Sequence, residues 1–156
     1  MRLSDVLRED AILLDIKGID KWMAIERLTS LLVESAQIEP QRQAAVLEAL
    51  LARERSMSTG MENGIAIPHC SVDSIDHTLI SIGISPEGIE FDSIDGTAAR
   101  LIFLLVTPKN RTKDHIKTLA EIAKLLSHEA FRQRLLASTS ASEVLEATRQ
   151  EEQALG

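Results

Sequence analysis

Residues 99–108 read ARLIFLLVTP, a nearly continuous apolar run that ends at Pro108. Strands that are buried on both faces of a sheet show such runs, whereas strands with one solvated face alternate apolar and polar residues. We therefore predict a central strand here. The segments on either side of it must then supply neighbouring strands and the helices that cover both faces.

Helical and extended patterns precede this run. Residues Ser4 to Arg8 predict a short helix and residues 11–16 (AILLDI) a strand. Asp20 can cap a helix, and Pro40 stands where a first-turn proline opens a second one. The inward positions of these two helices are Ile25, Leu28, Leu32 and Ser35, then Val46, Leu47, Leu50 and Leu51.

Turn-rich residues separate the next elements. SMSTGMENG (56–64) predicts a loop, GIAIPH (64–69) a short strand, HTLISIGIS (77–85) a longer strand, and Asp95-Gly96 a turn.

Further helices are expected after the apolar run. Thr112 can cap a helix over residues 112–126, with Ser127 and Ser140 starting two short ones. The expected inner stripe of the first is Ile116, Leu119, Ala123 and Leu126. Ser140 and Glu143 form a capping-box pattern, and the tail, QEEQALG, is expected to fray.

Helices thus lie before, between and after the strands. This order predicts an α/β fold in which a mixed β-sheet carries helices on both faces. At 156 residues the chain fits a single domain over residues 1–156, with its core at about residues 2–148.

Composition excludes several functions. A net charge of -7 and 3% aromatic residues disfavour nucleic-acid binding, which needs basic patches and stacking side chains. No apolar run approaches the ~18 residues of a membrane span, so no membrane insertion is expected, and the N-terminus has no secretory pattern. A single cysteine fits a reducing compartment. We therefore expect a cytoplasmic protein, whose acidic charge suits a basic protein partner.

His69 is the first candidate for chemistry. Pro68 fixes its own φ and biases Ile67 toward an extended backbone, so His69 leaves a predicted strand end along a defined path. Functional groups of α/β sheets lie beyond strand ends. The alternative is a half-buried histidine that ends a strand.

Two further residues suit a phosphate. His115 lies in the first turn of a predicted helix, where the positive end of the helix dipole attracts anions. Arg53 offers a planar guanidinium near the loop before His69, although Arg55 fits the spacing as well. The alternatives are a solvated histidine and a surface charge.

Other chemistries fit poorly. Cys70 follows His69 directly, and successive side chains of an extended chain point to opposite faces, so the two make a poor nucleophile and base. The four histidines and this cysteine show no ligand spacing for a metal, and the glycines match no nucleotide-binding pattern.

The segment STGMENGIAIPH (58–69) resembles the active-site segment of enzyme IIA domains of the fructose/mannitol type, in the bacterial phosphotransferase system. That pattern reads roughly S/T-T-G-I-G-N-G-I-A-I-P-H. LLARERSMSTG, IEFDSIDGTAARLIFLLVTP and TKDHIKTLAEIAKLL are similar to the family in order and spacing, over about residues 2–148.

The resemblance implies a covalent phosphotransferase that uses neither metal nor other cofactor. His69 would accept the phosphoryl group as phosphohistidine, His115 would hydrogen-bond it, and Arg53 would be the nearby cation. The loop and rim candidates are Ser58, Thr59, Gly60 and Asn63. Met57 and Met61 belong either to an apolar rim for partners or to the core.

The sequence departs from the family pattern in two places. Met61-Glu62 replaces Ile-Gly, and Cys70 replaces a common Gly. Glu62 adds a negative charge near the expected site, and it would be strained if that Gly needs a positive φ.

The likeness is greatest to the nitrogen-regulatory branch. It implies a phosphoryl donor of the HPr type and regulated target proteins, in nitrogen or carbon metabolism and potassium handling. Alternatives are a sugar-transport IIA that phosphorylates a IIB domain, and an interaction module that is never phosphorylated.

Overall fold

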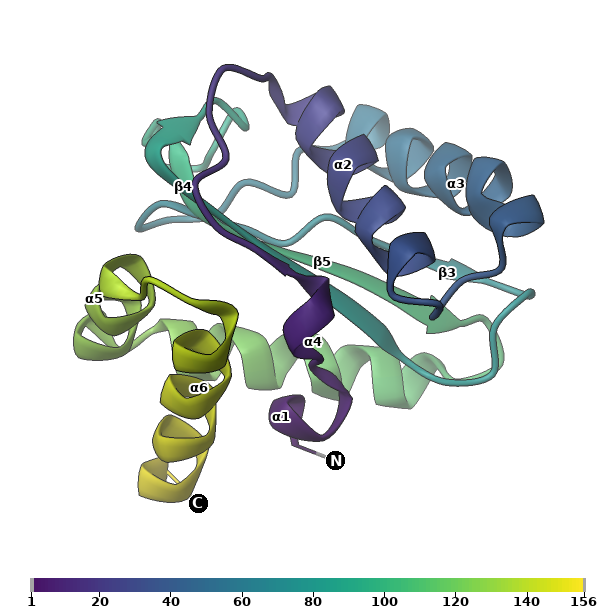
Figure 1. Cartoon of the computed structure of the whole chain (residues 1–156). Helices are drawn as coiled ribbons and strands as arrows, with labels where there is room; N and C mark the ends of the chain where they lie inside the picture. Colours follow the sequence, from purple (N-terminus) through teal and green to yellow (C-terminus); the bar gives the residue numbers. More distant parts are fainter. Residues whose placement is uncertain (1, 156) are drawn as a thin grey trace.

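A mixed five-stranded sheet forms the centre of the computed structural model, which describes residues 2–155 (Figure 1). Its strands are β1 (Ile12–Leu13), β2 (Ile65–Ala66), β3 (His69–Val72), β4 (Leu79–Ile89) and β5 (Ala99–Pro108). β5 pairs antiparallel with β4 on one edge and parallel with β2 and β3 on the other. β1 runs parallel to β4 and closes the far edge. The predicted central strand is therefore confirmed.

Helices cover both faces of this sheet, as predicted (Figure 1). One face carries α2 (Lys21–Glu34) and α3 (Gln43–Ser56). The other carries α1 (Leu3–Val6), α4 (Thr112–Leu126), α5 (Glu129–Ala137) and α6 (Ala141–Leu155). Short 3-10 turns span Glu9–Ala11 and Pro40–Arg42. Within residues 2–155, no helix has the length and apolar character that a membrane crossing requires.

The α2–α3 layer agrees with the sequence prediction in most details. Asp20 caps α2, because its side chain accepts a hydrogen bond from the Met23 N–H at 2.9 Å. All four predicted inward residues of α2 are buried. On α3, Val46 and Leu50 are buried, whereas Leu47 and Leu51 are only partly so. Pro40 opens the 3-10 turn that leads into α3 rather than α3 itself.

The strand expected over residues 11–16 is shorter than predicted. Only Ile12–Leu13 form β1, because Asp15 at φ 60° and Gly18 at φ 75° turn the chain toward α2. The strand expected over residues 77–85 is β4, which starts at Leu79 and continues to Ile89 past a register shift. The predicted turn is present, with the Gly96 N–H donating to the Ser93 carbonyl at 3.1 Å.

The predicted inner stripe of α4 is right at Leu126, partly buried at Leu119 and Ala123, and wrong at Ile116. Ile116 is 61% exposed, while Thr118, Ile122, Leu125 and Leu126 are buried. Thr112 is the first helical residue, and Arg111 before it makes no side-chain cap. The buried face of α4 therefore includes Ile122, an apolar residue outside the predicted stripe.

The C-terminal elements also differ. Ser127 ends α4, and α5 begins at Glu129. Ser140 accepts from the Glu143 N–H, but the Glu143 carboxylate reaches back to Thr139 rather than to Ser140.

The expected frayed tail is helical. α6 runs to Leu155, and Met1 and Gly156 lie outside the described residues. Glu152 is 3% exposed and accepts a hydrogen bond from the Ser4 hydroxyl at 2.5 Å. The sequence did not predict this contact, because the apolar pattern of α6 does not show that α1, at the other end of the chain, packs against it.

Replacing Ser4 by Ala should therefore destabilise the fold. The Glu152 carboxylate would stay buried without its hydroxyl donor, which costs about 1–3 kcal/mol. Urea unfolding measures the free energy. Ser138→Ala, at an exposed helix end, is the control and should change it by less than about 0.5 kcal/mol. Equal effects of the two substitutions would contradict the role of Glu152.

Candidate active site

Pro68 divides one edge strand into β2 and β3. Ala66 pairs with Ile102 and His69 with Leu105, so the register along β5 is the same on both sides of the break. Proline lacks an N–H, so one donor is missing from the ladder there, while the Pro68 carbonyl oxygen still accepts the Leu105 N–H at 2.9 Å. The side-chain alternation continues across the break. His69 is thus the first residue of a strand, whereas the sequence prediction made it the last residue of one.

The His69 ring is fixed by the chain just before it. Its Nδ1 lies 2.7 Å from the Ile67 carbonyl oxygen. A carbonyl only accepts, so Nδ1 carries the proton and donates it. In the neutral ring the lone pair is then on Nε2.

His115 stands beside His69 on the α4 face of the sheet. The two ring centroids are 5.3 Å apart. Nδ1 of His115 lies 2.7 Å from the hydroxyl of Thr107, which is itself 3.0 Å from the hydroxyl of Ser71. Adjacent strands β3 and β5 thus orient His115 through two side-chain hydroxyls.

Arg53, rather than Arg55, belongs to this cluster. Its guanidinium donates to the Met57 carbonyl oxygen at 2.7 Å and acts electrostatically on both His69 and His115. Arg55 is exposed and pairs with Glu48 at 3.3 Å. Arg53 and Arg55 lie in the last turn of α3, but their side chains point in different directions because residues two apart do not share a helix face.

The loop candidates serve mainly to shape the loop. The Ser58 hydroxyl donates to the Phe91 carbonyl oxygen, and Thr59 is buried against Glu54. Gly60 has no room for a Cβ, which would lie 2.8 Å from the Phe91 carbonyl oxygen. Asn63 is exposed at φ 64°, and its N–H donates to Asp95.

Both histidines are held in the neutral form. Burial lowers the pKa of His69 below 6.5; the Ile67 hydrogen bond opposes this shift, and Arg53 adds to it. Burial likewise lowers the pKa of His115, with His69 and Arg53 acting in the same direction. A neutral imidazole is the form that has a lone pair for attack on phosphorus.

Sequence comparison places this cluster in a known family. Residues 5–150 match the family model "Phosphoenolpyruvate-dependent sugar phosphotransferase system, EIIA 2". The chain belongs to this family. His69, His115 and Arg53 therefore lie together in an EIIA domain, a phosphoryl-transfer component of that system.

Individual relatives include regulatory and sugar-specific members. A nitrogen regulatory protein from Escherichia coli is 35% identical over 92% of the chain and 87% of its own length. The fructose-specific EIIABC component of Bacillus subtilis is 30% identical over 94% of the chain, which spans only 23% of that larger protein.

Solved structures give the same result. Nitrogen regulatory protein IIA-Ntr from Neisseria meningitidis superposes with a TM-score of 0.85 and is 31% identical, covering 94% of the chain and 98% of its own. The E. coli mannitol IIA, solved in complex with phosphorylated mannitol IIB, has a TM-score of 0.77 at 28% identity, covering 92% and 97%.

The two departures from the family pattern leave the histidine cluster intact. Cys70 is buried on the opposite face from His69, and burial raises its pKa to about 12, so the thiol stays protonated. Glu62 is exposed. The positive-φ residues of this turn are Asn63 and Gly64, so the strain considered for Glu62 does not arise.

Exposed apolar side chains are available to a partner. Met57 is 70% exposed after the end of α3, and Ile116 stands next to His115 on α4. Met61 is half-buried and packs into the core of the α4 face. Of the two methionines considered, Met57 therefore suits the rim and Met61 anchors the loop.

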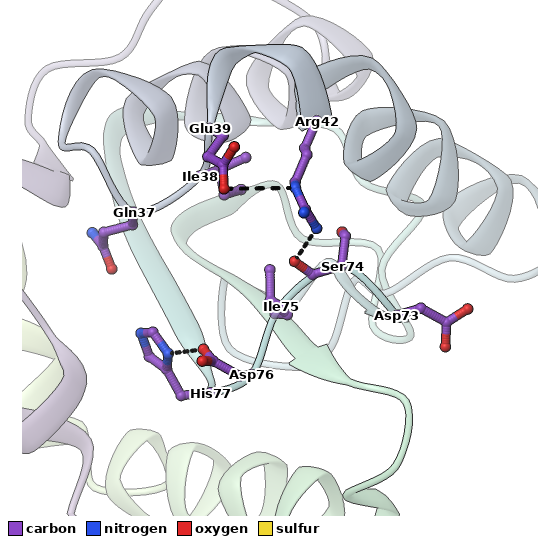
Figure 2. A pocket seen from close by; sticks show the side chains of 9 residues that line it. All are labelled: Gln37, Ile38, Glu39, Arg42, Asp73, Ser74, Ile75, Asp76 and His77. Carbon is purple, nitrogen blue, oxygen red and sulfur yellow. Dashed lines mark hydrogen bonds and ion pairs between the residues drawn. The ribbon is translucent and has the colours of Figure 1, made fainter.

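A separate hollow of about 380 Å³ lies beyond the other end of β3 (Figure 2). Several of its polar groups already have partners within the protein: Arg42 donates to the Ser74 carbonyl oxygen at 2.5 Å, and His77 lies 2.7 Å from Asp76. None of the predicted site residues lines it. It is not part of the histidine cluster.

Sequence reasoning missed the residues that orient the histidines. Thr107 left a weak signal as a hydroxyl residue within a buried strand, and Ser71 as one that follows His69 at an interval of two residues. Glu54, between two arginines, was not singled out in the sequence, and its side chain is fully buried.

We predict that His69 and His115 titrate below pH 6.5 in the folded protein. The unfolded chain then binds protons first on acidification, so the free energy of unfolding should fall as the pH drops below about 6.5. Nitrogen-15 NMR of the imidazoles gives both midpoints, with the urea-unfolded chain as reference. Midpoints at or above the unfolded values would contradict the burial of this cluster.

Proposed function

We propose that the protein is a phosphocarrier that accepts a phosphoryl group on Nε2 of His69 from a phosphohistidine carrier of the HPr type. The observation that carries the proposal is the hydrogen bond of Nδ1 to the Ile67 carbonyl oxygen, because it leaves the lone pair on Nε2. Family membership supplies the chemical context.

In the transfer, the Nε2 lone pair attacks phosphorus as the nitrogen–phosphorus bond of the donor breaks. The donor imidazole keeps the electron pair of the broken bond. The ring of His69 gains positive charge, which the Nδ1–H bond to Ile67 stabilises. The step thus moves one phosphoryl group from the donor imidazole to His69.

Arg53 and His115 stabilise the three phosphoryl oxygens in this mechanism. Arg53 contributes fixed positive charge. His115 contributes an Nε2–H donor, provided that its Nδ1 accepts a hydrogen bond from Thr107. In this arrangement the Ser71 hydroxyl donates to Thr107, whose hydrogen goes to His115 at 2.7 Å rather than to the more distant Cys70 carbonyl oxygen at 3.4 Å.

The proposed outputs follow the nitrogen-regulatory relatives. The phosphorylation state of His69 would control target proteins in nitrogen or carbon metabolism and potassium handling by direct binding. Exposed Met57 and Ile116 beside the histidine cluster suit such docking. The second candidate is transfer to a IIB domain, which the mannitol complex of a relative favours.

We expect incubation with phosphoenolpyruvate, enzyme I and an HPr-type carrier to add one acid-labile phosphoryl group to the protein. Intact-protein mass spectrometry measures it. His69→Ala should abolish the gain, and His115→Ala should slow it about 100-fold, as expected for loss of one charge-stabilising donor.

His77→Ala is the matched control, since His77 is exposed and lines the separate hollow. It should be phosphorylated at the wild-type rate. An unmodified wild-type protein beside a carrier shown to be phosphorylated would reject the proposal in favour of a binding module. Onward transfer to a IIB domain would favour the sugar-transport role.

Thr107→Val should lower the phosphorylation rate about ten-fold, as the loss of an orienting partner of a functional histidine typically does. The substitution keeps the shape but frees Nδ1 of His115, so its Nε2–H form is no longer enforced. Thr148→Val, which removes another buried hydroxyl on α6, should leave the rate unchanged. An unchanged rate in Thr107→Val would contradict the hydroxyl pair as the orienting group.

A further inference from the structure

A buried lysine lies at the start of α2. The side chain of Lys21 is only 9% exposed, and burying an ammonium group is costly. The N-terminal turn of a helix also carries positive potential, which disfavours a cation. A cation here stabilises neither the core nor the helix, so the contacts that Lys21 makes indicate its role.

The Lys21 ammonium connects α3 to the loop between β4 and β5. Its Nζ lies 3.3 Å from a Glu54 carboxylate oxygen and 3.0 Å from Asp92. The rings of Trp22 and Phe91 lie 4.9 Å and 5.9 Å from it. Two carboxylates and two aromatic faces therefore hold one charge.

Glu54 uses both of its oxygens on the loop before His69. One accepts the Thr59 N–H at 2.9 Å and the other the Thr59 hydroxyl at 2.5 Å. With a fully buried side chain, these bonds are not shared with bulk water.

The same hydrogen bonds continue to the imidazole. The Thr59 carbonyl oxygen accepts the Ile67 N–H at 3.1 Å. The Ile67 carbonyl oxygen then accepts Nδ1–H of His69 at 2.7 Å. A continuous path runs from the buried ammonium to the ring.

Asp92 adds a second attachment. It has a left-handed backbone at φ 54°, a strained conformation that the Lys21 contact helps to retain. The carbonyl oxygen of the preceding Phe91 accepts the Ser58 hydroxyl. Lys21 thereby fixes both of the segments that hold residues 58–60.

We propose that Glu54, with Lys21 as its counter-ion, is a positioning residue for phosphoryl transfer. It holds Thr59, and through it the Ile67 carbonyl, where that carbonyl keeps the His69 proton on Nδ1 and the lone pair on Nε2. Lys21 offsets the carboxylate charge, so that an anionic phosphoryl group can approach. The inference rests on the proposed role of His69 as acceptor.

The decisive variant is Lys21→Met/Glu54→Leu, which replaces the buried ion pair by apolar side chains of similar size. Such replacements often preserve stability. A purely structural pair then predicts normal transfer, whereas a positioning pair predicts a folded protein with a poorly oriented histidine.

Two readouts separate these outcomes: the single-turnover phosphorylation rate at saturating phosphorylated carrier, and the His69 tautomer from nitrogen-15 NMR. We expect a rate about 10- to 100-fold lower, with an unchanged half-saturating carrier concentration. The Nε2–H tautomer should become populated. Arg55→Met/Glu48→Leu, an exposed pair on the same helix, is the control and should match wild type.

A folded double variant with wild-type rate and tautomer would overturn the proposal. If that variant does not unfold cooperatively, Glu54→Gln, which keeps one acceptor oxygen, replaces it; we expect about a ten-fold lower rate, and a wild-type rate again overturns the proposal. The tautomer is read on unphosphorylated protein. Failure of positioning is therefore distinguishable from failure of wild type to accept a phosphoryl group at all.

Discussion

Burial of β5 on both faces is the constraint on which the rest of the structure depends. Residues 101–106 of this strand are at most 1% exposed, so every backbone N–H and C=O along it needs a partner within the protein. β4 on one edge and the β2–β3 edge strand on the other provide them. Two apolar faces then require two helical layers. His69 takes its position from the pairing of β3 with this strand.

The site arises where that constraint is locally relaxed. Pro68 has no N–H to donate to β5, although its carbonyl oxygen accepts the Leu105 N–H at 2.9 Å, and the chain on either side of it keeps the register with β5. Alternation then places His69 toward α4 and Cys70 toward α3, which separates the candidate imidazole from a buried, protonated thiol. The Ile67 carbonyl, next to the break, becomes available to the His69 ring. A strand interruption thus supplies both the exposure and the orientation of the histidine.

Buried polar groups give this site its precision at the expense of stability. Thr107 and Glu54 both lie where apolar residues would pack without a desolvation cost. Thr107 contacts the ring of His115 directly. Glu54 contacts Thr59, in the loop that leads to His69. Functional sites in proteins commonly concentrate such local conflicts. The two apolar clusters that cover the faces of the sheet compensate for them.

The sequence by itself determined the α/β class, the central strand, the helical layers and the residues of the histidine cluster, because apolar periodicity and a long motif are local properties of the chain. It did not determine that Ile122 rather than Ile116 is buried on α4, since the two side chains are equally apolar. It missed the helical tail, whose Glu152 is buried against Ser4 from the other end of the chain. Nor did it distinguish the buried Glu54 from the exposed Arg55 beside it. Those features depend on contacts between segments far apart in the sequence, and only the tertiary structure decides them.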